Sequence, residues 1–284
     1  MVKYKHFVIT LFNLRRVWLT DKKNKETCTE EWLSKRFDLF DTYCFPSIIQ
    51  QDNKNFTWLC LLDEGTPQKY KDLIKEYESK CPQMEACYFS EDEMDNWAEH
   101  IRTLIRNRMD GDEEYLMTTN TDTDDSLHKN MINRLHEEFK KKHEEGVYSI
   151  LFGYQYFMSM NLMLKMRYPH SHFLTLVEKY TPDFKTVKYK PHGQIRKFFN
   201  TVDIKTEPYW VEFVHDTNIN NDLRITSRIK YYPVFKTVSL KDFGLDITIS
   251  KSRNVVNTLI KMPWLFTKTA VKKIIKKSKK KKKA

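Results

Sequence analysis

The sequence predicts an α/β fold of the Rossmann type, with a mostly parallel central sheet and helices on both faces. Three observations predict it. Short apolar runs alternate with helical patterns through the first half of the chain, polar residues follow the apolar runs directly, and closely spaced strand-like runs take over from residue 147. With 284 residues, of which 40% are hydrophobic, the chain is long enough to bury a sizeable core.

In the first half, continuous apolar runs predict buried strands, and apolar residues recurring every three or four positions predict helices. The expected strands are 6–12, 56–62, 84–89 and 115–119. The expected helices are 33–48, bent by Pro46 near its end, then 66–80, opened by Thr66 as N-cap and Pro67, then 94–105 and 127–139.

From residue 147 the runs lie too close together for intervening helices. Strands are expected at 147–152, 154–160, 162–168, 172–178 and 209–214. These predict antiparallel strands or hairpins added to the sheet, and the pattern is weak beyond residue 220. No internal repeat and no Gly/Ser-rich linker interrupts the chain.

An acidic loop, Asp122-Thr123-Asp124-Asp125, follows the expected strand 115–119. Asp122 and Asp124 form a D-x-D element, whose hard oxygen ligands suit Mg²⁺ or Mn²⁺ with positions left for phosphate oxygens. The alternative is an ordinary acidic loop that caps the next helix through Asp125 or Ser126.

Other polar residues follow the neighbouring strands. Thr10 and Asn13 end the first strand, and Asp63 ends the second. Because ligands of such sheets gather at the carboxyl ends of the strands, we expect these residues to converge with the acidic loop. Asp63 alone fits a turn residue in Asp63-Glu64-Gly65 equally well.

The net charge of +11 is concentrated at the C-terminus. Nine Lys and no acid lie between Lys272 and Lys283, which leaves 11 − 9 = +2 for the rest of the chain. A nucleic-acid partner is therefore not expected.

Residues 251–284 are expected to form a basic amphipathic tail. Apolar residues from Trp264 to Ile275 are interleaved with Lys, a pattern typical of a helix lying on a membrane surface. The alternative, a disordered solubilising tail, suits the last six residues as well.

Cysteine usage and the start of the chain bear on location. The 5 Cys are odd in number and lack C-x-x-C spacing, which favours free thiols in a reducing compartment. The first six residues lack the features of a signal peptide, and no apolar run reaches the length of a membrane span. We therefore expect a cytoplasmic protein, peripheral to the membrane.

Several segments together resemble the putative rhamnosyltransferase family, which consists of GT-A type glycosyltransferases that use nucleotide sugars. They are HFVITLFNLR, RFDLFDTYCFPSIIQQ, FTWLCLLDEGTP, YLMTTNTDTDD, HFLTLVEK and PYWVEFVHDTNINN, spread from His6 to Asn221. The resemblance implies a GT-A-like domain over 1–250, with a nucleotide-binding half at 1–146 and an acceptor half at 147–250. Asn120 and Asp216 depart from the family's usual Arg and Gly.

The resemblance also implies roles for individual residues. Asp122 and Asp124 would bind Mn²⁺ or Mg²⁺ and the donor diphosphate, and His215 would complete the metal site, although a strand-end His bonded to its own loop is as good a reading. Donor contacts would come from several further residues: Thr10, Asn13, Arg15, Asp63, Arg102 and Thr119. Arg102 also fits a solvated position on a helix face.

Transfer to a glycan or lipid-linked acceptor hydroxyl would need a general base if the enzyme inverts configuration. Glu178 is the first choice, with Asp125 and Asp183 as rivals, and Glu178 with Lys179 fits a surface pair equally well. Three other functions stay open: a metal-dependent nuclease, a glycoside hydrolase, and a catalytically inactive membrane-associated binding protein of the same fold. The near-neutral body weighs against the nuclease, and the paired Asp against the hydrolase.

Overall fold

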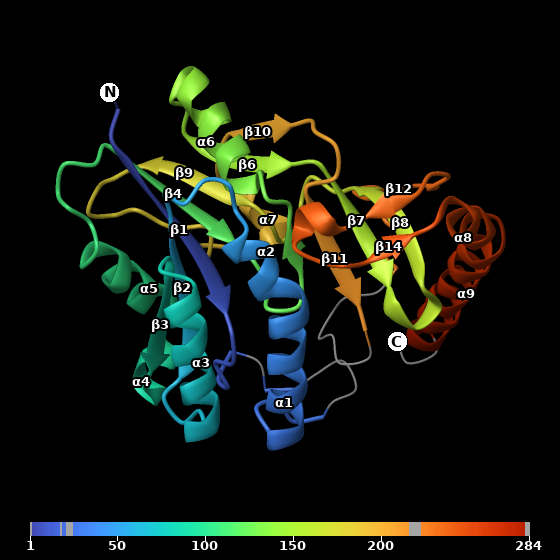
Figure 1. The fold of residues 1–284 in the computed structure, drawn as a ribbon, viewed down its shortest axis with the longest axis horizontal. Helices are drawn as coiled ribbons and strands as arrows, with labels where there is room; N and C mark the ends of the chain where they lie inside the picture. Colours follow the sequence, from blue (N-terminus) through green and yellow to red (C-terminus); the bar gives the residue numbers. More distant parts are fainter. Residues whose placement is uncertain (1, 18, 21–24, 216–222, 282–284) are drawn as a thin grey trace.

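A seven-stranded sheet forms the centre of the protein in a computed structural model, which describes residues 2–17, 19–20, 25–215 and 223–281 (Figure 1). Its strand order is β10-β6-β9-β4-β1-β2-β3. The four strands of the first half run parallel to one another: β1 (Tyr4–Leu11), β2 (Thr57–Asp63), β3 (Met84–Phe89) and β4 (Tyr115–Asn120). The predicted Rossmann-type core, with mostly parallel strands, is therefore confirmed.

The second half extends this sheet, as the change of pattern after residue 147 predicted. β9 (Thr175–Lys179) runs antiparallel between β4 and β6 (Gly146–Ile150), and β10 (Thr201–Ile204) runs parallel to β6 at the edge. Because β6, β9 and β10 belong to the same sheet as β1–β4, the sheet crosses the division placed at residue 147.

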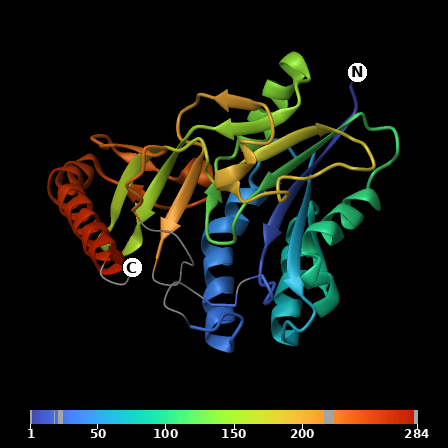
Figure 2. The same cartoon turned by 180° about the vertical axis from the view of Figure 1, so that it is seen from behind.

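A five-stranded sheet lies beside the first, in the order β12-β8-β7-β11-β5 (Figure 2). Its strands are β5 (Ser126–Leu127), β7 (Phe152–Phe157), β8 (Leu162–Arg167), β11 (Trp210–Val214) and β12 (Lys230–Tyr232), and η2 (Met158–Met160) joins β7 to β8. Gly153 lets the ring of Trp210 lie against the backbone of β7, since a Cβ there would fall 2.1 Å from Trp210 Cδ2. A small ribbon of β13 (Val238–Ser239) and β14 (Thr248–Ile249), with η3 (Lys241–Phe243) between them, packs nearby.

Alternation along β1 divides the core between the two faces of the central sheet. Val8 packs with side chains of α1 (Glu30–Leu39), α2 (Phe45–Ile49), α3 (Gln68–Lys80) and α6 (Met131–Lys142). Phe7 and Ile9 pack on the opposite face with α4 (Glu91–Asp95) and α5 (Trp97–Arg106). The short α7 (His192–Ile195) inserts the fully buried Ile195 into this second layer. Helices thus cover both faces, as a largely parallel sheet requires.

The bend predicted at Pro46 takes the form of a wide helical turn. Between α1 and α2 lies η1 (Phe40–Cys44), where the N–H of Phe45 donates to the carbonyl of Phe40, five residues back. Proline lacks an N–H and its ring crowds the preceding turn, so the regular hydrogen-bond ladder is lost there.

Three local predictions were wrong. Thr66 does not cap α3, because its hydroxyl donates to the carbonyl of Asp63 and accepts from Asn13. The helix expected from Leu127 begins at Met131, because Leu127 pairs with Trp210 in β5. Finally, the helix expected over 94–105 is broken at Asn96 into α4 and α5.

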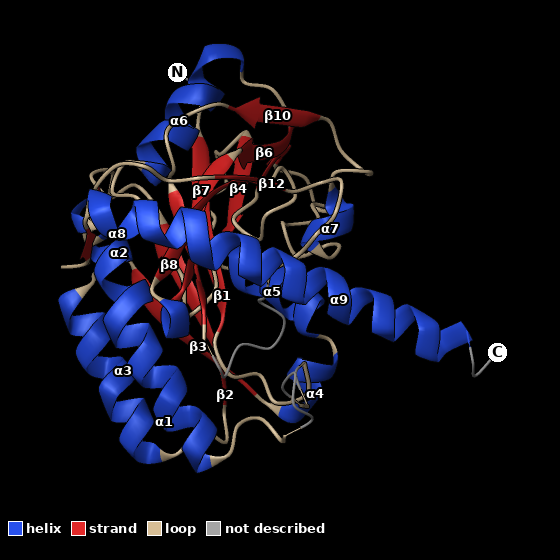
Figure 3. Ribbon diagram, turned by 90° about the vertical axis from the view of Figure 1, so that its right-hand side faces the viewer, coloured by secondary structure: helices blue, strands red, loops and turns tan. Residues whose placement is uncertain are grey.

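The C-terminal segment is helical, in the order α8 (Lys251–Val256), η4 (Asn257–Lys261) and α9 (Met262–Lys281). Leu265 is 7% exposed and Phe266 meets Tyr231 edge-on at 5.5 Å, so one face of α9 packs on the second sheet. Figure 3 shows the last turns of α9 projecting beyond the rest of the molecule. Among the described residues, no helix has both the length and the apolar character needed to cross a membrane.

Candidate active site

The acidic loop leaves the carboxyl end of β4, in the middle of the central sheet, and turns toward the second sheet. Asp122 is partly exposed, whereas Asp124 and Asp125 are buried. Buried carboxylates are costly unless they are paired, so their partners define what the loop can do.

Asp125 is fully buried and joins three elements. One oxygen lies 2.6 Å from His172 Nε2, and the other accepts the backbone N–H of Phe213 in β11 at 2.8 Å. Burial raises the pKa of Asp125 to about 8, helped by the neighbouring Asp124 and opposed by His172. Since both oxygens are engaged, Asp125 orients His172.

Asp124 is held between a cation and an imidazole. Its Oδ2 lies 3.3 Å from Arg36 of α1 and 2.9 Å from His215 Nε2. Burial alone would raise the pKa of Asp124, but Arg36 and His215 outweigh it and hold the pKa below its usual range. Asp124 and His215, which are far apart in sequence, thus lie within hydrogen-bond distance, as predicted.

Asp122 faces solvent beside His172, with 3.8 Å between its Oδ2 and Nε2 of the imidazole. Burial lowers the pKa of His172, yet Asp122 and Asp125 together raise it to about 9. Asn120 stands where the family usually has Arg. Its side-chain oxygen accepts a hydrogen bond from the ammonium of Lys188, and its side-chain nitrogen donates one to the carbonyl of His172. Burial lowers the pKa of Lys188 to about 8.

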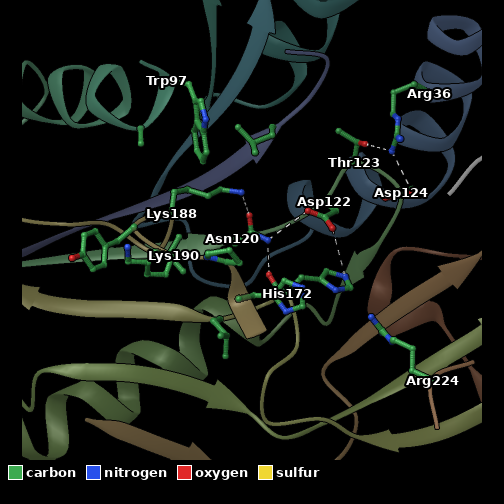
Figure 4. A pocket seen from close by; sticks show the side chains of 17 residues that line it. Arg36, Trp97, Asn120, Asp122, Thr123, Asp124, His172, Lys188, Lys190 and Arg224 are labelled. Atoms are coloured by element: carbon green, nitrogen blue, oxygen red, sulfur yellow. Dashed lines mark hydrogen bonds and ion pairs between the residues drawn. The ribbon is translucent and has the colours of Figure 1, made fainter. Parts of the chain in front are cut away.

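These groups line one side of a pocket of about 510 Å³ (Figure 4). Trp97 of α5 and Arg224 also line it, and the segment 187–192 contributes six consecutive residues. A pocket of this size, with apolar walls and a few convergent charged groups, is typical of a small-molecule site.

The cluster fits a divalent metal. Asp122, Asp125 and His172 each offer a ligand atom within 4.8 Å of the others, and Asp124 with His215 lies directly beside them. Carboxylate oxygens and neutral imidazole nitrogens are ligands that Mn²⁺ and Mg²⁺ sites use.

The residues expected at the nucleotide lie at the ends of β1 and β2, as predicted, but they contact one another. Arg15 forms a two-point ion pair with Asp63, which also accepts the N–H of Gly65. The side-chain oxygen of Asn13 accepts the N–H of Asp63 at 3.2 Å. This group is preassembled at the ends of β1 and β2 and does not line the pocket, so its contact with a donor stays a prediction.

Thr10 and Thr119 are not where a donor could reach them. Thr10 is fully buried and accepts from Trp58 Nε1 at 2.9 Å. Thr119 is fully buried between His6 and Thr175. Both side chains point from the strands into the layer beneath the helices, because strand residues alternate between the two faces.

Arg102 and the first-choice base also lie outside the pocket lining. Arg102 pairs with Glu99 and donates to the carbonyl of Phe184. Glu178 lies opposite Leu116, toward the start of β4, and accepts the backbone N–H groups of Lys185 and Thr186. The strand pairing thus carries Glu178 away from the acidic loop.

Among the remaining base candidates, Asp125 is buried behind the pocket, and Asp183 is an exposed turn residue that does not line it.

Several residues that line the pocket were not predicted as site residues, among them Arg36, His172, Lys188 and His192. Arg36 falls within the expected helix 33–48 and His172 begins the expected strand 172–178, whereas Lys188 and His192 belong to no expected element. His172 does stand at the head of HFLTLVEK, a segment that carried the family resemblance. Arg36 likewise begins RFDLFDTYCFPSIIQQ, but its role in the site becomes visible only through its contact with Asp124.

Residues 10–226 match the sequence profile of the family described as Putative rhamnosyl transferase. The chain belongs to this family. By its description this is a family of glycosyltransferases, so the predicted resemblance is confirmed. No curated protein matches the chain.

Solved structures share the fold only distantly. Residues 1–349 of TarS from S. aureus superpose with a TM-score of 0.43 at 10% identity, covering 75% of this chain and 60% of that one. The same protein in complex with UDP-GlcNAc gives 0.42 at 11% identity, covering 77% and 60%. A putative nucleotide-diphospho-sugar transferase from Desulfovibrio desulfuricans G20 gives 0.33 at 8%, covering 74% and 82%.

Proposed function

We propose that this protein transfers a hexose, with rhamnose the first to test, from a nucleoside-diphosphate sugar to a glycan or lipid-linked acceptor. The observation that carries the proposal is the cluster that Asp122 and Asp124, just after β4, form with His172 and His215. Asp122, Asp124 and His172 line the 510 Å³ pocket. Family membership supports the same reaction class.

We assign Asp122, Asp124 and His215 to a divalent metal, with the hydrogen-bonded pair of His172 and Asp125 next to Asp122. A bound Mn²⁺ or Mg²⁺ would neutralise the negative charge of the donor diphosphate. Lys188 lies beside this cluster through Asn120, and Arg36 lies beside Asp124. These two cations are placed to stabilise charge that grows on the departing diphosphate as the glycosidic bond breaks.

The acceptor hydroxyl attacks the anomeric carbon, and its proton must pass to a base if the reaction inverts configuration. His192 replaces Glu178 as the proposed base because it lines the pocket. Its Nδ1 lies 2.7 Å from the carbonyl oxygen of His170 and donates a hydrogen bond to it. Nε2 of His192 is therefore unprotonated and can take up the proton of the sugar hydroxyl. Burial lowers the pKa of His192 to about 4, so the imidazole is neutral at pH 7.

We also propose that α8, η4 and α9 rest on a membrane. Large apolar side chains on their outer face are exposed, including Leu259 at 64%, Ile260 at 65%, Trp264 at 54% and Ile274 at 68%. The Lys-rich end of α9 supplies positive charge, which anionic lipid attracts by roughly 1 kcal/mol per residue. Phe266 is not part of this face, because it packs on Tyr231.

The membrane proposal is tested by vesicle co-sedimentation of the full chain. Trp264→Glu with Ile274→Glu should release the protein from anionic vesicles, whereas Leu19→Glu should not, although Leu19 is 70% exposed. Equal binding of all three proteins would contradict the proposal.

The catalytic proposal is tested by incubating the protein with Mn²⁺ and a panel of nucleotide sugars, and measuring release of nucleoside diphosphate. We expect release with one donor, loss of release in excess chelator, and a rise in Tm with the matching nucleoside diphosphate. His192→Gln should lower kcat while leaving donor KM unchanged. A Tm rise without turnover of any donor would favour the inactive binding protein instead.

A further inference from the structure

Beside the pocket, residues 184–202 carry five cationic side chains and no acid. The cations are Lys185, Lys188, Lys190, Arg196 and Lys197. Within the described part of the chain, no ion pair joins Lys185, Lys190 or Lys197 to a carboxylate, whereas Arg196 pairs with Asp203 just after the segment. Lysines left without acids next to a cavity create a local positive potential.

Two exposed aromatic rings stand within this segment. Tyr189 is 41% exposed and Phe198 is 52% exposed, and their rings meet edge-on with centroids 6.0 Å apart. The ammonium of Lys190 lies over both rings, at 4.8 Å and 5.5 Å from their centroids. We define Lys185, Tyr189, Lys190, Lys197 and Phe198 as the basic aromatic rim.

The rim is fixed to the sheet rather than being a loose loop. Glu178 accepts the N–H groups of Lys185 and Thr186, and Thr118 accepts that of Val187 at 2.8 Å. Thr186 takes φ of 68°, a left-handed conformation that is strained for a β-branched residue. Strain of this kind persists where the surroundings impose it, and it concentrates at ligand sites.

The cations of the segment divide by what they contact. Lys188 points to Asn120 and the acidic cluster, and therefore belongs with the diphosphate of the donor. Lys190 also lines the pocket, but its ammonium lies over the rings of Tyr189 and Phe198. Tyr189 and Lys190 of the rim thus line the pocket together with the proposed base His192, whereas Lys185, Lys197 and Phe198 lie outside its lining.

We infer that the basic aromatic rim binds the acceptor, and that the acceptor is an anionic glycan carrying phosphate or carboxylate groups. An aromatic ring offers an apolar face to the C–H groups of a sugar ring, and lysine ammonium groups bind phosphate as point charges. This inference rests on the proposed function, since it names the second substrate of the same pocket.

The test measures binding of two soluble probes to the full-length protein by titration calorimetry. One probe is an oligosaccharide bearing a phosphomonoester, and the other is the same oligosaccharide after phosphatase treatment. The wild type should bind the phosphorylated probe at least about tenfold more tightly. Lys185→Ala with Lys190→Ala should reduce this ratio to about 2, because the phosphate loses both partners. Tyr189→Ala should weaken both probes equally.

Matched controls separate the rim from general basicity. Lys140→Ala with Lys142→Ala, on exposed positions of α6, removes the same charge and should leave the ratio unchanged. Equal affinity of the wild type for both probes would overturn the inference, and so would an equal loss in the control.

Two further measurements keep this result distinct from failure of the proposed function. Stabilisation by nucleoside diphosphate with Mn²⁺ should be the same in wild type and rim variant. A loss there would assign the rim to the donor and overturn the inference. Binding to anionic vesicles should also be unchanged, and a loss in the rim variant would assign it to lipid headgroups instead.

Discussion

A buried pair of histidines beneath the site is expected to make the fold sensitive to acid. His6 and His136 are 2% and 1% exposed, and 2.8 Å separates His6 Nδ1 from His136 Nε2. Asn53 Nδ2 donates to His136 Nδ1, so His136 donates to His6, and His6 in turn donates to Thr119. This order of donors leaves both imidazoles neutral.

Protonating either ring would set two N–H groups against each other in a dry site. Burial lowers the pKa of His136 to about 4, and burial together with His136 lowers the pKa of His6. The unfolded chain binds protons below about pH 6.5, where the folded chain does not. Stability is therefore fully present above pH 6.5 and is lost as the pH falls, until His136 itself titrates near pH 4.

The size of the effect follows from the number of protons. Each histidine that charges only on unfolding costs about 1.4 kcal/mol of unfolding free energy per pH unit below pH 6.5. Between pH 7 and pH 5 the pair should cost about 4 kcal/mol, and His136→Gln should recover about half of this slope. Gln suits the site because its amide can still donate to His6.

Urea unfolding at pH 5, 6 and 7 measures the slope directly. Other titrating groups contribute equally to wild type and variant, so the difference in slope isolates His136. His6→Asn gives an independent second variant with the same expectation. If the unfolding free energies of wild type and variants fell in parallel with pH, the reasoning from burial would be refuted.

Three further changes have definite expected outcomes. Asp122→Asn should reduce the affinity for Mn²⁺, measured by EPR, by about tenfold or more, because a ligand is lost. The Tm should stay nearly unchanged because the Asp122 carboxylate is partly exposed, and full Mn²⁺ affinity would remove Asp122 from the metal site. Glu178→Gln should lower the unfolding free energy by about 1–3 kcal/mol but leave kcat intact, since the carboxylate holds two backbone N–H groups; a stable variant with lost kcat would restore it as the base. Gly153→Ala should destabilise by about 1–3 kcal/mol in thermal unfolding because the added Cβ meets Trp210, and an unchanged Tm would contradict that packing.

The parallel half of the fold could be predicted because its signals are local. A strand made of a continuous apolar run, such as β2, buries all its side chains only in a sheet that is covered on both faces. The position of Asp122 and Asp124 followed from the same reasoning, since residues after such strands collect at one edge. His215 came from family resemblance, because no local pattern links residues 91 positions apart.

What failed depended on pairing across the chain. Glu178 ends a strand, as the expected site residues do, but β9 runs antiparallel to β4, so its end lies at the opposite edge. Thr10 and Thr119 lie near the carboxyl ends of their strands, as predicted, but their side chains point to the buried face of the sheet and not toward the site. Arg36 was given no role although it begins the segment RFDLFDTYCFPSIIQQ, because a buried ion pair leaves no periodic trace in the sequence.

Asp125 has a consequence for modular engineering of this fold. Its two oxygens connect His172, in the segment just before β9 of the central sheet, to the backbone of β11 in the second sheet. A chimera that grafts another protein's second sheet onto this nucleotide-binding half must therefore bring a backbone N–H to the place of Phe213. Without that N–H, Asp125 would no longer hold His172 in its orientation, even though every proposed metal ligand was retained. The choice of a crossover point therefore depends on keeping this hydrogen bond, and not only on cutting the chain within a loop.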